Sequence, residues 1–308
     1  MWTPSEQLRW KFAAAVLLFD GLGCLFLGLA ISPDVWLIFL EIAALAAFGL
    51  FYRIKRNEPR VAHTFISLAQ LGLYTLALCV ASYVIVRFNR PFIDDVLYHL
   101  DKLLGFDWFP AFVAANKMPW LSSIMITAYN SSPVQIVLIT VFLGLTLATE
   151  RLEKFLEAFM IGGVITLSLW AIYPSFGAAT YAITAGLTNA MPGLADALPF
   201  VKPQLALLSG EMTTIEISKL QGIVGAPSFH TVMALVSVYA FKDRGIWFVL
   251  MAGWNIIVIC SVPVFGCHHL IDVFAGAAVA LTAIALAERL AAARAGSSNG
   301  AVLRPIAT

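Results

Sequence analysis

Long apolar segments follow one another along almost the whole of this 308-residue chain, separated by polar connections. A helix needs about 20 mostly apolar residues to cross a lipid bilayer, and a spanning segment must pair its own backbone polar groups. Only 12% of the residues are charged, against about 25% in a typical soluble domain. The sequence therefore predicts an all-α polytopic membrane bundle of about eight transmembrane helices. The predicted spans are 12–31, 35–52, 64–86, 133–149, 155–173, 229–241, 246–264 and 268–288.

The basic residues indicate how these spans are oriented. With eight spans, most of the 19 Lys and Arg residues fall on one side of the membrane, together with both ends of the chain. Because cytoplasmic connections carry an excess of Lys and Arg, this side is predicted to be cytoplasmic. The alanine-rich helices are typical of a bacterial protein, so we expect an inner-membrane protein whose other side faces the periplasm. Two long connections, 88–132 and 174–226, lie on that outer side.

The first outer connection contains the pattern of an amphipathic helix. Between residues 93 and 104, apolar side chains recur at helical spacing, while acidic residues and Lys102 occupy the other face. Such a helix either lies in the headgroup layer of the membrane or packs over the mouth of the bundle. The second outer connection is too long for a tight turn, and we expect it to cap or line a functional site. The apolar residues of the pattern are Ile93, Val96, Leu97, Leu100, Leu103 and Leu104, and the acidic ones are Asp94, Asp95 and Asp101.

Two short motifs place ionisable side chains at the outer ends of predicted spans. The sequence P-S-F-H at 227–230 opens the sixth span, and G-C-H-H-L-I-D at 266–272 opens the eighth. Asp272 follows His268 by four residues, so the two side chains lie on one face of a helix. Ionisable groups inside hydrophobic segments are costly, and they mark functional sites by default.

These residue types are suited to covalent phosphoryl chemistry. A neutral imidazole nitrogen is basic yet uncharged, so His268 can attack phosphorus while Asp272 fixes the ring and stabilises the developing positive charge. His230, at the end of a neighbouring helix, can protonate the departing oxygen as a general acid. Ser228 can cap the helix that begins beside it and also donate to a phosphate oxygen. No metal or other cofactor is expected, because the nucleophile is a side chain rather than an activated water.

Other interpretations of these motifs stay open at this point. Each histidine taken alone is compatible with a packed, hydrogen-bonded residue of no catalytic role. Histidine and aspartate also form proton relays in transporters, but transporters usually place them near the midplane of repeated halves, and the sequence shows no internal repeat. The four cysteines contain no C-x-x-C pair, which indicates neither a disulfide framework nor a zinc site.

Several other polar residues lie within or beside the predicted spans. His269 points about 100° away from its neighbour on a helix, and it is predicted to be structural, with an auxiliary binding role as the alternative. Asp20 and Glu41 are predicted to take part in the packing of helices against one another. The alternative is that they belong to a proton or substrate pathway. Residues 129–132 are predicted to cap the span that follows them, or else to line a pocket.

The two motifs resemble signatures of the type-2 phosphatidic acid phosphatase superfamily, membrane lipid phosphatases that share a helical core with vanadium haloperoxidases. The second signature of that family, P-S-G-H, is similar to 227–230, with Phe in place of Gly. The third, S-R-x5-H-x3-D, is similar to the stretch with Ser261, His268 and Asp272, where Val262 replaces the arginine.

The resemblance implies roles for these residues and a division of the chain. His268 would be the nucleophile, Asp272 its orienting partner and His230 the acid for the leaving group. The similarity covers about 64–288. It implies a two-helix N-terminal addition (1–60) and a six-helix phosphatase or phosphotransferase core (61–290). The sequence that follows (291–308) predicts a disordered cytoplasmic tail.

The chain departs from the family pattern in its cations. The first signature, K-x6-R-P, is expected near 173–177, where no basic residue occurs. The inositol phosphorylceramide synthase branch shows the same loss, and the P-S-x-H and H-H-x-x-D forms are most similar to that branch. A buried phosphate still needs a positive partner. The outer-side candidates for binding the substrate phosphate, in addition to Ser228, are Arg90, Arg87, Lys202 and Lys219.

Taken together, the resemblance implies an integral-membrane enzyme that acts on a phosphorylated lipid at the outer face through a phosphohistidine. With water as acceptor it would be a lipid phosphatase. With an alcohol or sugar as acceptor it would be a headgroup transferase of the inositol phosphorylceramide synthase type, an inositolphosphotransferase. The expected partners are the lipid substrate, the bilayer and such an acceptor, and no nucleic acid. The missing cations leave open the alternative that this chain resembles a catalytically inactive family member, which binds its ligand without turning it over.

Overall fold

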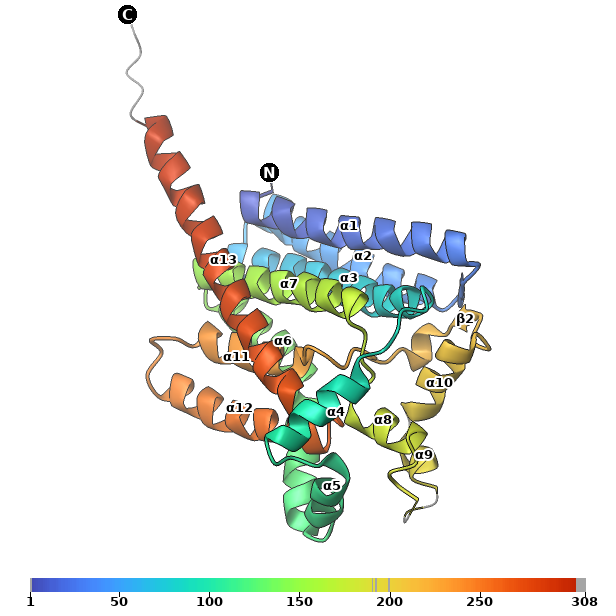
Figure 1. Cartoon of the computed structure of the whole chain (residues 1–308). Coiled ribbons are helices and arrows are strands. Elements are labelled where there is room, and N and C mark those ends of the chain that lie inside the picture. The colour runs from blue at the N-terminus through green and yellow to red at the C-terminus, as the bar shows by residue number, and fades with distance from the viewer. Residues whose placement is uncertain (1, 190, 192, 199, 303–308) are drawn as a thin grey trace, which may run out of the picture.

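The computed structural model describes residues 2–302 apart from 190, 192 and 199, and this part of the chain is almost entirely helical (Figure 1). Seven of its helices are long and apolar enough to cross a membrane. The chain is therefore an integral membrane protein with the predicted all-α polytopic architecture. These helices are α1 (Pro4–Leu27), α2 (Val35–Phe51, continued by the π-helical turn η1, Tyr52–Arg56), α3 (Pro59–Val86), α6 (Pro119–Leu145), α7 (Thr149–Ile172), α12 (Ile246–Val264) and α13 (Leu270–Val302).

The sixth predicted span is shorter than a full transmembrane helix. α11 (Phe229–Ala240) has 12 residues, about 18 Å at 1.5 Å per residue, whereas the hydrocarbon core of a bilayer is about 30 Å thick. α6, α7, α12 and α13 all pack against it, so protein surrounds much of this short helix. Within the described part, the predicted bundle thus consists of seven full-length helices and one short one.

The helix α6 begins at Pro119 rather than at residue 133, where the span was predicted to start. Pro133 lies inside the helix, and residues 129–132 are helical, so the predicted cap at these residues is wrong. Transmembrane helices tolerate proline where side-chain hydroxyls and neighbouring helices satisfy freed backbone groups. Beside the proline, the Ser131 hydroxyl donates to the Ala128 carbonyl (2.7 Å), and α3, α11 and α12 pack against this helix.

α3 and α7 form the centre of the bundle and are the most buried of the long helices. α3 packs against α1, α2, α6 and α7, and α7 packs in addition against α11 and α13. Figure 1 shows α1, α2, α3 and α7 running roughly parallel, with α13 crossing them at an angle. Tyr74 of α3 is fully buried, and its hydroxyl donates to the Met160 carbonyl of α7 (2.5 Å).

The two ends of the bundle carry different parts of the chain. The start of α1 and the last turns of α13 lie toward one end (Figure 1). Residues 291–302, predicted as the beginning of a disordered tail, continue α13 as helix, and 303–308 lie outside the described residues. The opposite end, called the loop end below, gathers the short elements. These are α4 (Asp94–Leu103), α5 (Trp108–Asn116), α8 (Ala178–Thr184), α9 (Leu194–Ala197), α10 (Val201–Ser209) and the 3₁₀ turn η2 (Ile217–Lys219).

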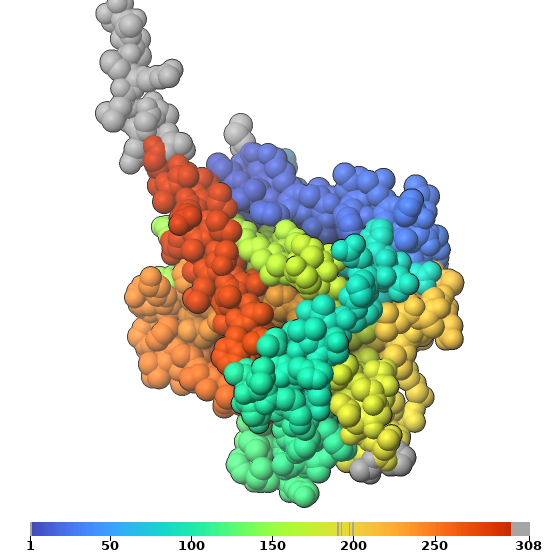
Figure 2. All heavy atoms as spheres, viewed as in Figure 1, coloured from blue at the N-terminus to red at the C-terminus, as the bar shows by residue number. Residues whose placement is uncertain are grey.

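The amphipathic helix predicted in the first outer connection is α4, and it lies across the loop end with its carboxylates facing the protein. Asp94, Leu97 and Asp101 are buried, whereas Val96 and Leu103 are 53% and 83% exposed. α4 packs on α8 and α13, and Figure 2 shows it covering this face of the molecule. The helix therefore packs over the mouth of the bundle and presents its apolar side outward.

A pair of short parallel strands joins the α1–α2 connection to the second outer connection. β1 (Ala30–Ile31) pairs with β2 (Thr214–Ile215). Beside the pair, Asp34 accepts a hydrogen bond from the Ser218 backbone N–H (2.9 Å). The predicted N-terminal addition is thus fastened to segment 174–226 at the loop end.

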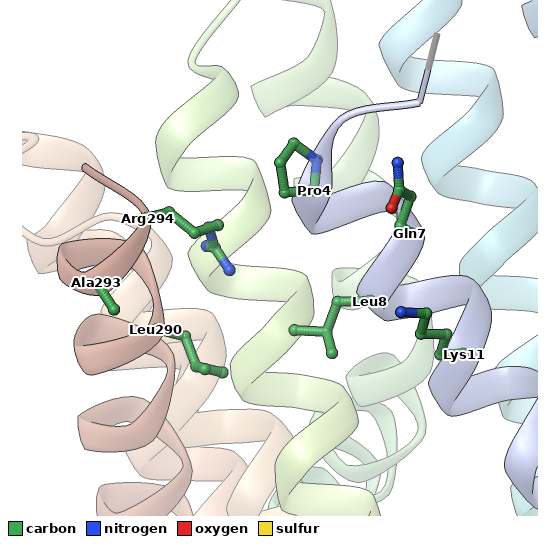
Figure 3. Close-up of a pocket in the computed structure, with 7 residues that line it drawn as sticks. All are labelled: Pro4, Gln7, Leu8, Lys11, Leu290, Ala293 and Arg294. Atoms are coloured by element: carbon green, nitrogen blue, oxygen red, sulfur yellow. The ribbon is translucent and has the colours of Figure 1, made fainter. Parts of the chain in front are cut away.

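A buried ionic network holds the end that carries the termini. Arg9 is 1% exposed and donates to Ser5 Oγ and Gln70 Oε1, both at 2.7 Å. Ser5 donates to Glu157 Oε1 (2.5 Å), and Glu157 Oε2 accepts from Arg294 Nη2 (3.0 Å). The network connects α1, α3, α7 and α13. Next to it, α1 and α13 border a cavity of about 430 Å³ (Figure 3), lined by Pro4, Gln7, Leu8, Lys11, Leu290, Ala293 and Arg294.

Replacing Glu157 with Gln removes the buried carboxylate that pairs with Arg294 and accepts from Ser5. Because the buried carboxylate accepts hydrogen bonds from both Ser5 and Arg294, we expect the free energy of unfolding to fall by about 1–3 kcal/mol. The measurement is the melting temperature of the purified protein in detergent. Glu150→Gln on the same helix is the control, because its carboxylate is 80% exposed and exposed pairs contribute about 0–1 kcal/mol. Equal melting temperatures for the two variants would contradict this account.

Candidate active site

The P-S-F-H motif forms the start of α11, as predicted. The Ser228 hydroxyl oxygen accepts from the Thr231 backbone N–H (3.3 Å) and caps the helix, and the Ser228 backbone N–H donates to the Asp272 carbonyl (3.0 Å). α13 approaches this turn closely at Gly276, where a Cβ atom would lie 2.5 Å from the Ser228 carbonyl oxygen. The two motifs, about 40 residues apart in the chain, are therefore in direct backbone contact.

His268 and Asp272 lie at the beginning of α13 with the predicted spacing. His268 Nδ1 is 3.4 Å from Asp272 Oδ2, and the same oxygen accepts from the His269 backbone N–H (3.0 Å). Asp272 is fully buried, and its Oδ1 atom has no hydrogen-bond partner among the described residues. The carboxylate thus engages Nδ1 of His268 and leaves Nε2 as the ring nitrogen available to a ligand.

His230 lies beside His268, with a ring-centroid separation of 6.4 Å. Its imidazole stacks on the Tyr129 ring of α6, with centroids 3.8 Å apart and planes inclined by 18°. Tyr129 in turn packs on Gly266, where a Cβ would lie 2.4 Å from the ring. The sequence left a pocket role for residue 129 open, and the structure shows that Tyr129 orients the second histidine.

Both histidines line one large cavity of about 1010 Å³. Its polar lining includes Tyr129, Asn130, Gln204 and Gln221, and the rest is mostly apolar. Among the described residues, no Lys or Arg lines this cavity.

The residues predicted to bind the substrate phosphate lie outside that lining. Arg90 is exposed. Lys202 pairs with Asp196, and Lys219 pairs with Glu216 (2.6 Å), both in exposed positions. Ser228 is fully buried in its cap and does not face the cavity. These four residues therefore do not contact the space between the histidines, unlike His268, His230 and Asp272, which the structure brings together.

A second set of acidic residues holds the turn that carries His268, and the sequence analysis did not assign it a role. Asp101 of α4 accepts from the backbone N–H groups of Leu270 and Ile271, both at 3.0 Å, and from His269 Nδ1 (3.1 Å). A helix begins with unpaired N–H groups and a positive dipole end, both of which a carboxylate stabilises. Asp101 therefore caps α13 from another helix.

Asp94, two turns nearer the start of α4, makes the corresponding contacts to the second outer connection. It accepts from Ser175 Oγ (2.7 Å) and from the backbone N–H groups of Gly177 (2.9 Å) and Phe176 (3.3 Å). Its Oδ1 also lies 3.4 Å from His269 Nε2. The signal in the sequence was the spacing of Asp94 and Asp101, which puts both on one helical face.

His269 is a buried cation between these two carboxylates. Burial lowers its pKa, but the hydrogen bond to Asp101 and the interaction with Asp94 outweigh burial and raise the pKa of His269 to about 9. The two carboxylates therefore favour the protonated ring at neutral pH. The ring is fully buried and is not part of the cavity lining. This arrangement supports the structural role predicted for His269.

Within the described ranges, no group of three or more His, Cys, Asp or Glu side chains has the arrangement of a metal site. The expectation that the reaction needs no metal stays a prediction.

The geometry agrees with an independent comparison of the sequence with protein families. The model of the PAP2 superfamily matches residues 95–286, which include α4 and both histidine motifs. The chain belongs to the PAP2 superfamily. The predicted resemblance is thus confirmed at the level of the superfamily, and PAP2 membership supports a phosphatase-like enzyme acting on phosphorylated lipids. A search of curated proteins and one of solved structures find no match.

The PAP2 match leaves α1, α2 and α3 outside it, because it begins at residue 95. Val262, at the position of the arginine in the third family signature, is fully buried in α12. That position of the PAP2 pattern is filled here by an apolar core residue.

Replacing Asp101 with Asn in this PAP2 site removes the charge that holds the first turn of α13. We expect the free energy of unfolding to fall by about 1–3 kcal/mol, because a buried N–H or the His269 cation loses its acceptor. Turnover of any substrate of the wild-type enzyme should fall as well, because His268 sits on this turn. Asp95→Asn is the matched control, since Asp95 is exposed on the same helix. If Asp95→Asn lost as much stability and turnover as Asp101→Asn, the specific role of Asp101 at the start of α13 would be refuted.

The raised pKa of His269 predicts how stability depends on pH. A histidine has an unfolded pKa of about 6.5, so the stabilisation is fully present below that pH. It is lost as the pH rises toward the folded value of about 9. The melting temperature of the wild type should therefore fall across this interval relative to that of Asp101→Asn. If the melting temperatures of the two proteins changed in parallel with pH, Asp101 would not be the cause of the raised pKa of His269.

Proposed function

We propose that this chain is an integral-membrane lipid phosphatase or phosphotransferase that works through a phosphohistidine on His268. The observation that carries the proposal is the cavity shared by two histidines whose ring centroids are 6.4 Å apart. A phosphorus atom between the rings is within reach of Nε2 of His268. Asp272, at Nδ1, holds the ring in orientation and stabilises its positive charge after attack.

The first half-reaction transfers the phosphoryl group to the enzyme. Nε2 of His268 forms a bond to phosphorus as the bond from phosphorus to the lipid oxygen breaks. His230 is placed to give a proton to the departing lipid alkoxide, so that a neutral alcohol leaves. Stacking on Tyr129 supports this role, because it fixes the direction of the His230 ring.

The second half-reaction releases the group to an acceptor. A water or alcohol oxygen attacks phosphorus, His230 takes the proton of the acceptor, and the bond between phosphorus and His268 breaks. The side chains are then back in their starting states. Water as acceptor makes the enzyme a phosphatase, and an alcohol makes it a transferase.

The neutral lining favours the transferase as the second candidate. A phosphate monoester carries up to two negative charges, whereas a phosphodiester carries one, and burying an unpaired charge is costly. No Lys or Arg lines the cavity in the described part of the chain. A phosphodiester lipid whose headgroup passes to a lipid or sugar alcohol suits such a site better than a dianion does. This is the chemistry of the inositol phosphorylceramide synthase branch.

We also propose that the site faces the periplasm of a bacterial inner membrane. The loop end holds both histidines, and most Lys and Arg residues lie toward the other end by the sequence count. The positive-inside rule then puts the loop end outside.

The test uses purified protein in detergent with EDTA. Phosphatidic acid, a prenyl diphosphate and phosphatidylinositol are supplied in turn, each with and without a long-chain fatty alcohol or inositol as an alcohol acceptor. We expect turnover in EDTA that is abolished in His268→Ala and reduced about 100- to 10,000-fold in His230→Ala, the range for loss of a general acid. His99→Ala, an exposed histidine of α4, should retain full activity.

The products distinguish the two candidates. Free phosphate establishes a phosphatase, and acceptor-dependent product without free phosphate establishes a headgroup transferase. An acid-labile phosphoenzyme that forms in the wild type and not in His268→Ala would identify the nucleophile. Absence of turnover with every donor, or turnover retained in His268→Ala, would overturn the proposal.

A further inference from the structure

The cavity at the histidines continues far along α3. Its lining on that helix recurs at helical spacing, from Ser82 near the loop end through Cys79 and Thr75 to Leu71 and Leu68. These positions form one face of the helix. The cavity therefore follows the axis of a central membrane helix instead of opening only at the membrane surface.

The part of the cavity that follows α3, called the arm below, is longer than one leaflet of the membrane is deep. Ser82 and Leu68 are 14 positions apart on a regular helix, which corresponds to about 21 Å at 1.5 Å per residue. Half of a hydrocarbon core of about 30 Å is about 15 Å. Leu68 also lies on the far side of the midpoint of α3 from the histidines. The arm thus passes the middle of the bilayer.

The polarity of the walls changes along the arm. Tyr129 stacks on His230 at the histidine end, whereas Leu45 of α2, Leu68 and other apolar residues line the deep end. On α6 the same order appears along the chain, with the deep positions Ile136 and Val137 following Tyr129 and Asn130. A molecule that fills this space has a polar head at the histidines and a long apolar part.

We propose that this arm binds the hydrocarbon tail of the phosphorylated lipid, and that α2 and α3 determine how long a tail the enzyme accepts. The inference rests on the proposed function, because it places the phosphate of the same lipid between His230 and His268. The occupant is a lipid tail rather than another protein, since the space lies between α3, α6, α7 and α11 and is continuous with the histidines. α2 and α3 lie outside the residues that the PAP2 model matches, so the proposed tail selection involves helices that this match does not cover.

The test measures binding in a His268→Ala background, so that it does not depend on turnover. Dioctanoyl and distearoyl phosphatidic acid are titrated against Leu68→Trp, which fills the deep end, and against Leu40→Trp. Leu40 is on α2, 67% exposed, and outside the cavity lining. We expect Leu68→Trp to weaken binding of the distearoyl lipid about tenfold, or about 1.4 kcal/mol, with the dioctanoyl lipid unchanged. Leu40→Trp should bind both lipids like the parent, and Leu71→Phe repeats the test if Leu68→Trp does not fold.

A photolabelling experiment locates the tail directly. Distearoyl phosphatidic acid with a diazirine at the tail terminus should label peptides that contain Leu45 or Leu68. The same lipid with the diazirine beside the headgroup should label peptides that contain Tyr129 or His230. Terminal labelling confined to outward-facing positions such as Leu40, or equal loss of both lipids in Leu68→Trp, would overturn the tail site.

These outcomes separate the tail site from the proposed chemistry. Deep labelling in a protein without turnover supports the tail site and rejects the catalytic proposal. Turnover that depends on His268, without tail-length selection or deep labelling, supports the catalytic proposal and rejects the tail site.

Discussion

The carboxylate of Asp101 determines where α13 begins, and the rest of the site depends on that position. The first turn of a helix has N–H groups without intrahelical partners, and at the start of α13 two of them donate to Asp101. His268 immediately precedes this turn, and Asp272 lies within it. The backbone contact between Ser228 and Asp272 then positions the start of α11, and with it His230. One acidic residue on a helix at the loop end is thus connected to every side chain of the proposed mechanism.

The acidic residues of α4 also explain the electrostatic character of the site. Asp94 accepts from the turn at 175–177, and Asp101 accepts from the start of α13. Both are groups of N–H donors of the kind that bind anions. The protein's own carboxylates occupy them, and the one buried cation nearby, among the described residues, is His269 between the two. A ligand in the cavity therefore meets neutral donors and the two histidines rather than fixed positive charge.

The sequence was sufficient for features that depend on local patterns. Apolar length predicted the membrane helices, helical spacing predicted α4 and the pairing of His268 with Asp272, and Ser228 was recognised as a helix cap. It was not sufficient where a contact joins distant segments. Asp101 and His269 are 168 positions apart, and nothing in a single sequence shows that a carboxylate on an outer helix caps a later one. The start of α6 was misplaced because a proline inside a helix has the same local signal as one at its boundary.

The strand pair at the loop end changes how the N-terminal helices are understood. β1 connects the turn between α1 and α2 with the segment that continues through residues 220–225 into the wall of the cavity. A chain lacking residues 1–60 would therefore lose more than two peripheral helices. It would also lose the strand partner of β2, the acceptor for Ser218, and the Leu45 side chain in the deep wall. The first helical hairpin is accordingly part of the frame of the site, and dissecting the protein at that boundary would release a wall of the cavity along with the hairpin.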